Sequence, residues 1–332
     1  MKAITQDRYG GPERLRWTEV ETPVPGDGEV LVRVRAASLN AYDWHFMRGD
    51  PYLMRSQMGL TRPARSIRGR DVAGEVAATF TNGTTTFDAG DAVFADLGHL
   101  QGTFAEYVCV PHHLLAPMPA GLSFAEAAAL PLAGNAALSC LRDGGLKAGQ
   151  TILINGASGG VGTFAVQIAK AREARVTAVC STRNVELVTK LGADRVIDYT
   201  VTDFATAPER YDVVLDLVGN RSLRDLRRVL TPDGTLVLSG GGVSTGGSLI
   251  GPMPLFVRGQ LLARLQRRQR VVVPGSDPSR ATLDELCTLI ESGRVTPAID
   301  RTFPLAEAAA AIRYLETEHA RAKVVLTVGP RE

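Results

Sequence analysis

The sequence predicts an α/β protein built from two parts, a β-rich part followed by a parallel sheet with helices on both faces. Its 332 residues are enough for two domains. Apolar and polar side chains alternate in Glu29–Ala37, as they do in a half-buried strand. Strand-like and helix-like segments alternate between residues 151 and 239, and a glycine-rich segment at residues 155–162 joins the first of these strands to its helix.

The first part covers residues 1–123. Asp71–Ala78 and Phe104–Val110 repeat the short alternating pattern, and glycine and proline separate the runs. Short strands punctuated by turn residues indicate an irregular antiparallel barrel or sandwich.

The second part begins near residue 124. Phe124–Leu141 is rich in alanine and leucine and predicts a helix. The strands predicted after it are Thr151–Asn155, Arg175–Cys180, Arg195–Asp198, Tyr211–Asp216 and Thr235–Ser239. The helices predicted between them include a segment with apolar residues at Val161, Phe164, Ala165 and Ile168, then Val185–Leu191 and Leu223–Leu230. Because the strands alternate with helices, the sheet is expected to be parallel.

The alternation ends after Gly240. Residues 240–254 predict a loop, and residues 255–270 a basic helix with a solvated face, whose Leu261, Leu262 and Leu265 are candidates to cover a cleft or meet a second subunit. Two helices, Leu283–Ser292 and Ala306–Glu316, and a strand, Lys323–Val328, are predicted to follow. We therefore divide the chain into residues 1–123, 124–270 and 271–332.

Composition and charge argue against several classes of protein. The formal net charge of +2 creates no strong field for nucleic acid or a membrane surface. The four cysteines have no Cys-x-x-Cys spacing, so neither a disulfide framework nor a structural zinc cluster is expected. The longest apolar stretch, Ala125–Leu141, contains Pro131, and the N-terminus lacks the apolar core of a signal peptide. We expect a cytoplasmic protein without a membrane span.

The glycine-rich segment predicts a dinucleotide site. Glycines let the backbone turn tightly and approach a pyrophosphate, and the N–H groups at the start of the following helix favour its negative charge. A plain glycine-rich turn is the alternative. The cofactor-binding residues predicted here are Gly156, Ser158, Gly159, Gly160, Val161 and Gly162.

The end of the second predicted strand favours NADPH over NADH. An NAD site usually carries Asp or Glu here for the ribose 2′-hydroxyl. This sequence instead has Ser181, Thr182 and Arg183, a pair of hydroxyls and a guanidinium that suit a 2′-phosphate. Ser181 and Arg183 are therefore predicted cofactor residues, with a solvated Arg183 as the alternative.

Several motifs together resemble the medium-chain dehydrogenase/reductase superfamily, in particular its zinc-free, NADP-dependent, quinone oxidoreductase-like branch. They are NGASGGVG at 155–162, SLNAYDW at 38–44, GRDVAGEV at 69–76, LGADRVIDY at 191–199 and AKVVL at 322–326, and they cover nearly the whole chain. The resemblance implies a GroES-like β-rich catalytic domain plus a Rossmann domain, a doubly wound parallel sheet. It also implies that the last segment returns to the catalytic domain.

The resemblance does not extend to a catalytic zinc. Zinc-dependent relatives place cysteine, histidine and cysteine at positions that fall near Asn40, at Arg70 and near Leu130 of this sequence. Arginine cannot ligate zinc, and a catalytic site needs three protein ligands. We expect no metal, and we interpret His99, His112 and His113 as surface or packing residues.

Without a metal, substrates that already accept hydride are favoured, namely quinones and α,β-unsaturated carbonyls. By motif position the catalytic candidates are Asn40 and Tyr52 as oxyanion donors, with Tyr52 also a proton source, and Asp43. Asp43 as a turn former and Tyr52 as an ordinary rim aromatic are the alternatives.

The resemblance implies further cofactor contacts. They fall at Asn135, Tyr199, Val218, Gly219, Ser239, Gly240 and Lys323. Asn135 stands where relatives commonly have threonine, and Lys323 has a plain surface lysine as its alternative. The predicted activity is NADPH-dependent reduction of a small-molecule quinone or enone, by a homodimer with no nucleic-acid partner. An enoyl-thioester or polyketide-type enone reductase and a weakly catalytic NADPH-binding protein remain open.

Overall fold

A computed structural model describes most of the chain. It covers residues 1–79, 86–240, 247, 249, 251, 254, 257–259, 268–275, 278–318 and 320–329. The chain forms two compact units. Unit 1 comprises Met1–Asn135, Asp277–Glu291 and Pro297–Glu332, and unit 2 comprises Ala136–Ser276 and Ser292–Thr296. The domain limits given above from the sequence stay a prediction.

Unit 1 is built on a seven-stranded sheet in the order β14-β15-β3-β4-β5-β7, with β6 also paired to β3. All of its pairings are antiparallel except that of β14 with β15. The strands are β3 Glu29–Leu39, β4 Asp71–Thr79, β5 Ala92–Asp96, β6 Tyr107–Pro111, β7 Ala116–Pro117, β14 Ile299–Pro304 and β15 Lys323–Thr327. Since β15 pairs with β3, the end of the chain adds a strand beside its beginning.

Strand β3 shows why this sheet forms. Its alternating pattern buries Val30, Val32 and Val34, and these side chains join one core with residues from β4, β5 and β15. The helices of unit 1 are α1 Ala41–Arg48, α2 Arg55–Met58, α3 Phe124–Ala128, α9 Arg280–Glu291 and α10 Ala308–Thr317. A separate antiparallel pair consists of β1 Lys2–Thr5 and β2 Arg16–Glu19.

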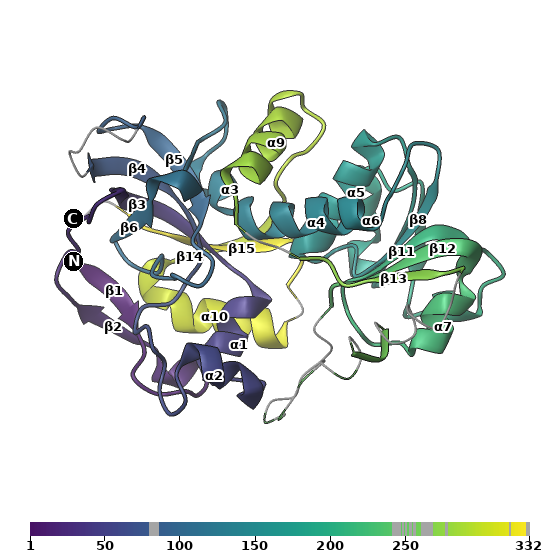
Figure 1. Ribbon diagram of the computed structural model, residues 1–332, viewed down its shortest axis with the longest axis horizontal. Helices are drawn as coiled ribbons and strands as arrows, with labels where there is room; N and C mark the ends of the chain where they lie inside the picture. Colours follow the sequence, from purple (N-terminus) through teal and green to yellow (C-terminus); the bar gives the residue numbers. More distant parts are fainter. Residues whose placement is uncertain are drawn as a thin grey trace. The chain divides into compact units, whose positions relative to one another are not determined.

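Unit 2 contains a six-stranded parallel sheet in the order β10-β9-β8-β11-β12-β13. Its strands are β8 Thr151–Asn155, β9 Arg175–Cys180, β10 Arg195–Asp198, β11 Tyr211–Asp216, β12 Leu230–Leu238 and β13 Arg270–Val272. In Figure 1, α5 Gly160–Ala171 and α6 Val185–Lys190 lie along one face of this sheet and α7 Leu223–Arg228 along the other. This is the doubly wound order of a Rossmann sheet, so the predicted fold class is confirmed.

The order of the strands creates a switch point at β8. The chain moves from β8 to β9 and β10 on one side, and then returns to β11 on the other side of β8. In open α/β sheets, ligands bind at the carboxyl ends of the strands at such a point. The glycine-rich segment follows β8 directly.

The structure differs from the prediction in several elements. The single helix predicted at Phe124–Leu141 is two helices, α3 and α4 Pro131–Asp143, because Pro131 lacks an N–H and is suited to the first turn of a new helix. The strands that the sequence did not predict are β1, β2, β5, β7, β13 and β14. Leu261, Leu262 and Leu265 of the predicted basic helix, and most of the predicted loop 240–254, lie outside the described residues.

Candidate functional site

The glycine segment forms a tight turn at the carboxyl end of β8. Gly156 has a φ of +87°, which side-chain-bearing residues rarely adopt. A Cβ atom on Gly162 would lie 2.2 Å from the Gly156 carbonyl oxygen, so the turn and the first turn of α5 are packed backbone against backbone. Only glycine permits this approach.

The start of α5 offers unpaired N–H groups beside this turn. The first α-helical hydrogen bond runs from the Thr163 N–H to the Gly159 carbonyl oxygen at 2.9 Å. The N–H groups of Gly160, Val161 and Gly162 therefore precede the helical ladder. Together with the dipole of a twelve-residue helix, they form a site suited to a pyrophosphate.

The other predicted cofactor residues of unit 2 lie at the same edge of the sheet, each after a different strand. Tyr199 follows β10, and its N–H donates to the carbonyl of Cys180, the last residue of β9, at 3.0 Å. The Cγ2 atom of Val218, after β11, lies 2.8 Å from where a Cβ on Gly156 would stand. A Cβ on Gly240, after β12, would lie 2.5 Å from the Val218 nitrogen. The structure thus brings these predicted residues together within unit 2.

Asp216, which the sequence reasoning missed, organises this edge. Its Oδ1 accepts hydrogen bonds from Asn155 Nδ2 at 2.9 Å and from the N–H groups of Val218 and Gly219, both at 3.1 Å. Both N–H groups therefore already donate to Asp216. Val218 and Gly219 can contribute van der Waals contacts to a cofactor, but not these backbone hydrogen bonds. Ser239 is half-buried at the end of β12, and its N–H donates to the Asp216 carbonyl at 3.0 Å.

The end of β9 carries no acid of its own, as predicted from its residues, but an acid lies beside it. Asp198, the last residue of β10, accepts hydrogen bonds from the Thr182 hydroxyl at 2.5 Å and the Thr200 hydroxyl at 2.7 Å. These hydroxyls lower the pKa of Asp198, so it is anionic at neutral pH. Arg183 is exposed on the following turn.

In unit 1, Lys323 lies at the centre of a buried polar cluster. Its Nζ is 2.6 Å from Asn40 Oδ1 and 3.4 Å from Asp71 Oδ2, and its side chain is only 2% exposed. Asp71 Oδ2 also accepts from Ser38 Oγ at 2.7 Å and from Asn40 Nδ2 at 3.0 Å. The surface interpretation of Lys323 was wrong. Burial lowers the pKa of Lys323, while Asp71 opposes that shift.

Asn40 and Asp43 meet at the start of α1. The Asn40 N–H donates to Asp43 Oδ2 at 2.8 Å, so Asp43 supports the helix start, as its structural interpretation expected. Burial raises the pKa of Asp43 to about 7, against the effect of this hydrogen bond. Lys323 donates to the amide oxygen of Asn40, and the amide nitrogen of Asn40 donates one of its two hydrogens to Asp71. The second Nδ2 hydrogen can therefore be donated to a further acceptor.

Arg70 occupies the position where zinc-dependent relatives have histidine. Its Nε and Nη2 donate to the two carboxylate oxygens of Asp96 at 2.9 and 2.8 Å, a buried bidentate ion pair. Its guanidinium also lies 4.3 Å from the ring centroid of Tyr42. The Tyr42 hydroxyl is 3.0 Å from His99 Nδ1, and burial raises the pKa of Tyr42 to about 12.

The two remaining candidates of unit 1 differ in exposure. Tyr52 is 43% exposed, and the Arg55 guanidinium lies 4.4 Å from its ring centroid. Asn135 lies in α4 and is 2% exposed. No hydrogen bond joins Tyr52 to the cluster of Asn40 and Lys323 among the described residues.

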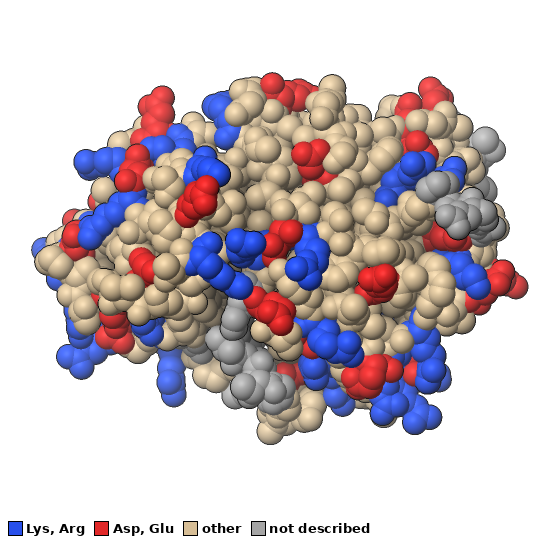
Figure 2. All heavy atoms as spheres, turned by 180° about the vertical axis from the view of Figure 1, so that it is seen from behind, with Lys and Arg blue, Asp and Glu red and all other residues tan. Residues whose placement is uncertain are grey.

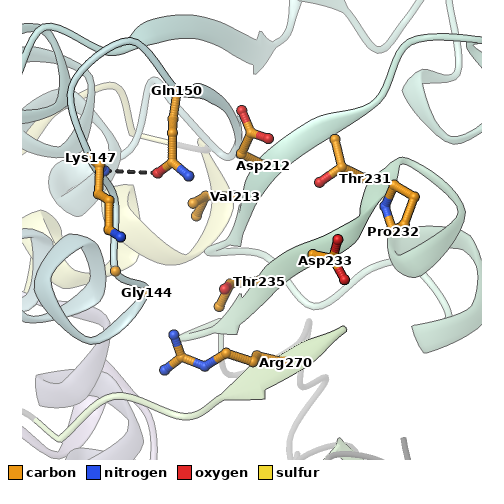
Figure 3. Close-up of a pocket in the computed structure, with 11 residues that line it drawn as sticks. Gly144, Lys147, Gln150, Asp212, Val213, Thr231, Pro232, Asp233, Thr235 and Arg270 are labelled. Atoms are coloured by element: carbon orange, nitrogen blue, oxygen red, sulfur yellow. Dashed lines mark hydrogen bonds between the residues drawn. The ribbon is translucent and has the colours of Figure 1, made fainter. Parts of the chain in front are cut away.

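A cavity of about 410 Å³ lies at the opposite, amino-terminal edge of the unit 2 sheet. Figure 3 shows its lining, which includes Gln150, Asp212 and Arg270 at or next to the starts of β8, β11 and β13, together with Lys147 and with Thr235 of β12. None of the predicted site residues lines it. The cavity is therefore separate from the edge that carries the glycine turn.

Three global features bear on partners. Figure 2 shows Lys and Arg interspersed with Asp and Glu over much of the face in view, and the predicted absence of a nucleic-acid partner stays a prediction. Among the described residues, no helix has the length and hydropathy needed to cross a bilayer. Nor do three His, Cys, Asp or Glu side chains gather as metal ligands in the part of the chain that the structure describes.

A doubly wound sheet with a glycine turn at its switch point, in a chain that also has a mostly antiparallel unit completed by the last strand, defines a dinucleotide-binding protein of two units. Comparison with known proteins agrees. The family described as "Alcohol dehydrogenase GroES-like domain" matches residues 26–120, and the one described as "Zinc-binding dehydrogenase" matches residues 191–326.

Full-length relatives narrow the family. The "Chloroplast envelope quinone oxidoreductase homolog" of Arabidopsis thaliana is 33% identical, over 98% of each chain. The "NADPH-dependent alkenal/one oxidoreductase, chloroplastic" of the same plant is 33% identical over 98% of this chain and 79% of its own. The solved quinone oxidoreductase of Coxiella burnetii has a TM-score of 0.83 and is 30% identical, over 99% of each chain. The chain therefore belongs to the quinone oxidoreductase-like branch of the medium-chain dehydrogenase/reductase superfamily.

Proposed function

We propose that this oxidoreductase uses NADPH, without zinc, to reduce a quinone or an α,β-unsaturated carbonyl compound. The observation that carries the proposal is the carboxyl edge of the unit 2 sheet, where a glycine turn at the switch point adjoins a strand end bearing Ser181, Thr182 and Arg183. The names of two relatives, a quinone oxidoreductase homolog and an NADPH-dependent alkenal/one oxidoreductase, point in the same direction.

The residues of this edge fit a phosphorylated dinucleotide. Gly160, Val161 and Gly162 would hold the pyrophosphate through their N–H groups, while Ser181 and Arg183 would hold the 2′-phosphate. Asp198 lies beside the end of β9, and its carboxylate already accepts hydrogen bonds from Thr182 and Thr200. Bound NADPH would supply the hydride.

The residues of unit 1 do not fit a catalytic zinc. The site needs three ligating side chains. At the first position inferred from relatives the chain has Asn40, whose amide bonds to Lys323 and Asp71. At the second it has Arg70, whose guanidinium donates to both carboxylate oxygens of Asp96. We propose that no metal takes part, although one matching family is described as zinc-binding.

The unit 1 residues have roles that follow from their hydrogen bonds. Asn40 would donate its remaining Nδ2 hydrogen to the oxygen of the substrate that becomes negatively charged. Asp43 and Tyr52 are the candidates for delivering the proton that completes reduction. Lys323 would hold the Asn40 amide rather than face the cofactor, because its Nζ is 2.6 Å from Asn40 Oδ1.

The test follows loss of NADPH absorbance with 1,4-benzoquinone, 3-buten-2-one and crotonyl-CoA as separate substrates, with and without EDTA. We expect turnover of the quinone or the enone, preference for NADPH over NADH, and no effect of EDTA. Inactivation by the chelator would overturn the zinc-free proposal. Binding of NADPH without turnover of any substrate would favour a non-catalytic role, and turnover of crotonyl-CoA alone would favour a thioester substrate.

The remaining parts of the proposal concern assembly and location. We propose a homodimer that acts on small molecules in the cytoplasm. Light scattering coupled to size-exclusion chromatography measures the first, and fractionation of the source cells measures the second.

A further inference from the structure

Asn184 joins the loops that follow β8 and β9 through one side chain. It ends the short 3-10 turn Thr182–Asn184 after β9 and precedes α6. Its Nδ2 donates to Ser158 Oγ at 2.9 Å and to Ser181 Oγ at 3.2 Å. Ser158 belongs to the glycine turn after β8, and Ser181 directly follows β9. A single amide therefore connects the two strand ends on one side of the switch point.

The direction of these two hydrogen bonds determines what the serines can do. A hydroxyl group has one hydrogen to donate and two lone pairs that accept. Because Asn184 occupies a lone pair of each serine, each hydroxyl hydrogen remains available to a different acceptor. Asn184 is 5% exposed, whereas Ser158 and Ser181 are half-buried and so reach solvent on their other side. The two hydroxyls can thus both donate outward from the sheet edge.

We propose that Asn184 is a positioning residue for the cofactor, which sets Ser158 as a donor to the pyrophosphate and Ser181 as a donor to the 2′-phosphate. The inference rests on the proposed binding of NADPH and deepens it. Ser158 lies beside the free N–H groups at the start of α5, and Ser181 lies where folds of this class hold the adenosine ribose. Asn184 touches neither phosphate and acts only through the two serines.

This arrangement couples the two phosphate subsites. When Asn184 orients both hydroxyls, loss of its amide weakens the donors to both phosphates at once. NADH lacks the 2′-phosphate and would accept a hydrogen bond from Ser158 but not from Ser181. Its binding is therefore weakened less than that of NADPH. The result is a contribution of Asn184 to the preference for NADPH, although Asn184 is not itself at the 2′-phosphate.

The test measures dissociation constants of NADPH and NADH for the whole protein by titration calorimetry. In Asn184→Ala we expect about threefold weaker binding of NADH, because one hydrogen bond is misdirected and loses only part of the roughly tenfold that a hydrogen bond to a charged group contributes. We expect about tenfold weaker binding of NADPH, because two such hydrogen bonds are misdirected and their effects multiply. The preference for NADPH, which is the dissociation constant of NADH divided by that of NADPH, therefore falls about threefold.

A double-mutant cycle separates positioning from a structural role. If Asn184 acts through Ser181, then adding Asn184→Ala to the Ser181→Ala variant weakens the binding of NADPH and of NADH by the same factor. Equal losses for both nucleotides in Asn184→Ala alone, or losses that simply add in the double variant, would overturn the inference. If the wild-type protein binds neither nucleotide or prefers NADH, the proposed function itself has failed. A wild-type preference for NADPH that Asn184→Ala leaves unchanged refutes only the role of Asn184.

A second variant tests the direction of the hydrogen bonds without emptying the site. Asn184→Asp keeps the shape, but its carboxylate only accepts, so both serine hydrogens turn inward. We expect weaker NADPH binding than in Asn184→Ala. Thr189→Asp, at an exposed position of α6, controls for added charge, since among the described residues the Thr189 hydroxyl bonds only to the Val185 carbonyl. Binding by Asn184→Asp equal to that of Thr189→Asp would show that the amide donor is not needed.

Discussion

Removing the charge of Lys323 tests whether the buried cluster of unit 1 is held together as the structure indicates. In Lys323→Met the apolar stem is largely kept, so the change removes the ammonium group and leaves little cavity. Asp71, which is 0% exposed, then loses its only cationic partner within ion-pair distance among the described residues. An uncompensated carboxylate remains in the interior of the unit.

The structure sets the size of the expected effect. Breaking a buried ion pair by removing one partner costs about 3–5 kcal/mol. Asp71 keeps hydrogen bonds from Ser38 Oγ at 2.7 Å, Asn40 Nδ2 at 3.0 Å and the Leu132 N–H at 3.0 Å. These three donors stabilise the anion, so we expect the lower end, about 3 kcal/mol. For a domain of this size that lowers the melting temperature by about 6–12 °C.

The loss depends on pH in a defined direction. Without Lys323, burial raises the pKa of Asp71 further above its unfolded value, so the folded state gains by binding a proton. A group with a raised folded pKa contributes stability below the unfolded pKa and loses it as the pH rises. The deficit of Lys323→Met should therefore be largest near neutral pH and shrink toward about pH 4.

The assay is denaturant unfolding of wild type, both single variants and the double variant Asp71→Asn/Lys323→Met. The double variant removes both charges and should recover at least about half of the loss. Lys2→Met is the matched control, because its pair with Glu19 is exposed and should contribute less than about 1 kcal/mol. A Lys323→Met loss as small as that of Lys2→Met, or purely additive losses in the double variant, would refute the reasoning.

Three further changes test other parts of the structure. Gly162→Ala places a Cβ 2.2 Å from the Gly156 oxygen, so we expect about 1–3 kcal/mol lower stability and weaker NADPH binding, with Gly275→Ala, where nothing lies within 4 Å, as the control. Tyr52→Phe should lower kcat about 100-fold if Tyr52 delivers the proton, with NADPH affinity unchanged, and wild-type kcat would remove it from that role. Asp43→Asn should be more stable than wild type by about 4 kcal/mol near pH 8 and nearly equal to it near pH 4, because a pKa raised from 3.8 to about 7 is worth about 4 kcal/mol once the carboxyl group is ionised. Stability curves of the two proteins that run parallel over this pH range would contradict the prediction.

Much of unit 2 could be predicted from sequence, for a physical reason. β8, β9, β10 and β11 begin and end at the predicted residues. β8, β9 and β11 are almost wholly buried, and a strand covered on both faces is a continuous apolar run with sharp polar ends. β14 was missed because its residues are mostly exposed or half-buried, and its pairing with β15 gives it no apolar pattern of its own. The four residues of β1 are too few to show a period.

The candidate site was predictable to the extent that it lies in contiguous motifs. Asn40 and Asp43 lie in one short segment and are joined by a local hydrogen bond. The partner of Lys323 is Asp71, 252 residues away, and no local pattern shows that a lysine at the start of a strand is buried. Asn184 was visible in the same strand end as Ser181, but its bond to Ser158 spans 26 residues and depends on the parallel pairing of β8 with β9.

Burial and the neighbouring charges of unit 1 together set the raised pKa of Asp43. Two cations, Arg70 and Lys323, face Asp96 and Asp71, and each cation is matched by one carboxylate. Asp43 is the third carboxylate, and Asp71 adds to the effect of burial in raising its pKa. A third buried cation, Arg68, also acts on Asp43 electrostatically, so the raised pKa of about 7 is due mainly to burial. At neutral pH Asp43 therefore exists in both its protonated and its ionised form. The protonated form places a proton beside Asn40, whose amide is the proposed oxyanion donor, and it is the form that proton delivery to the substrate would need.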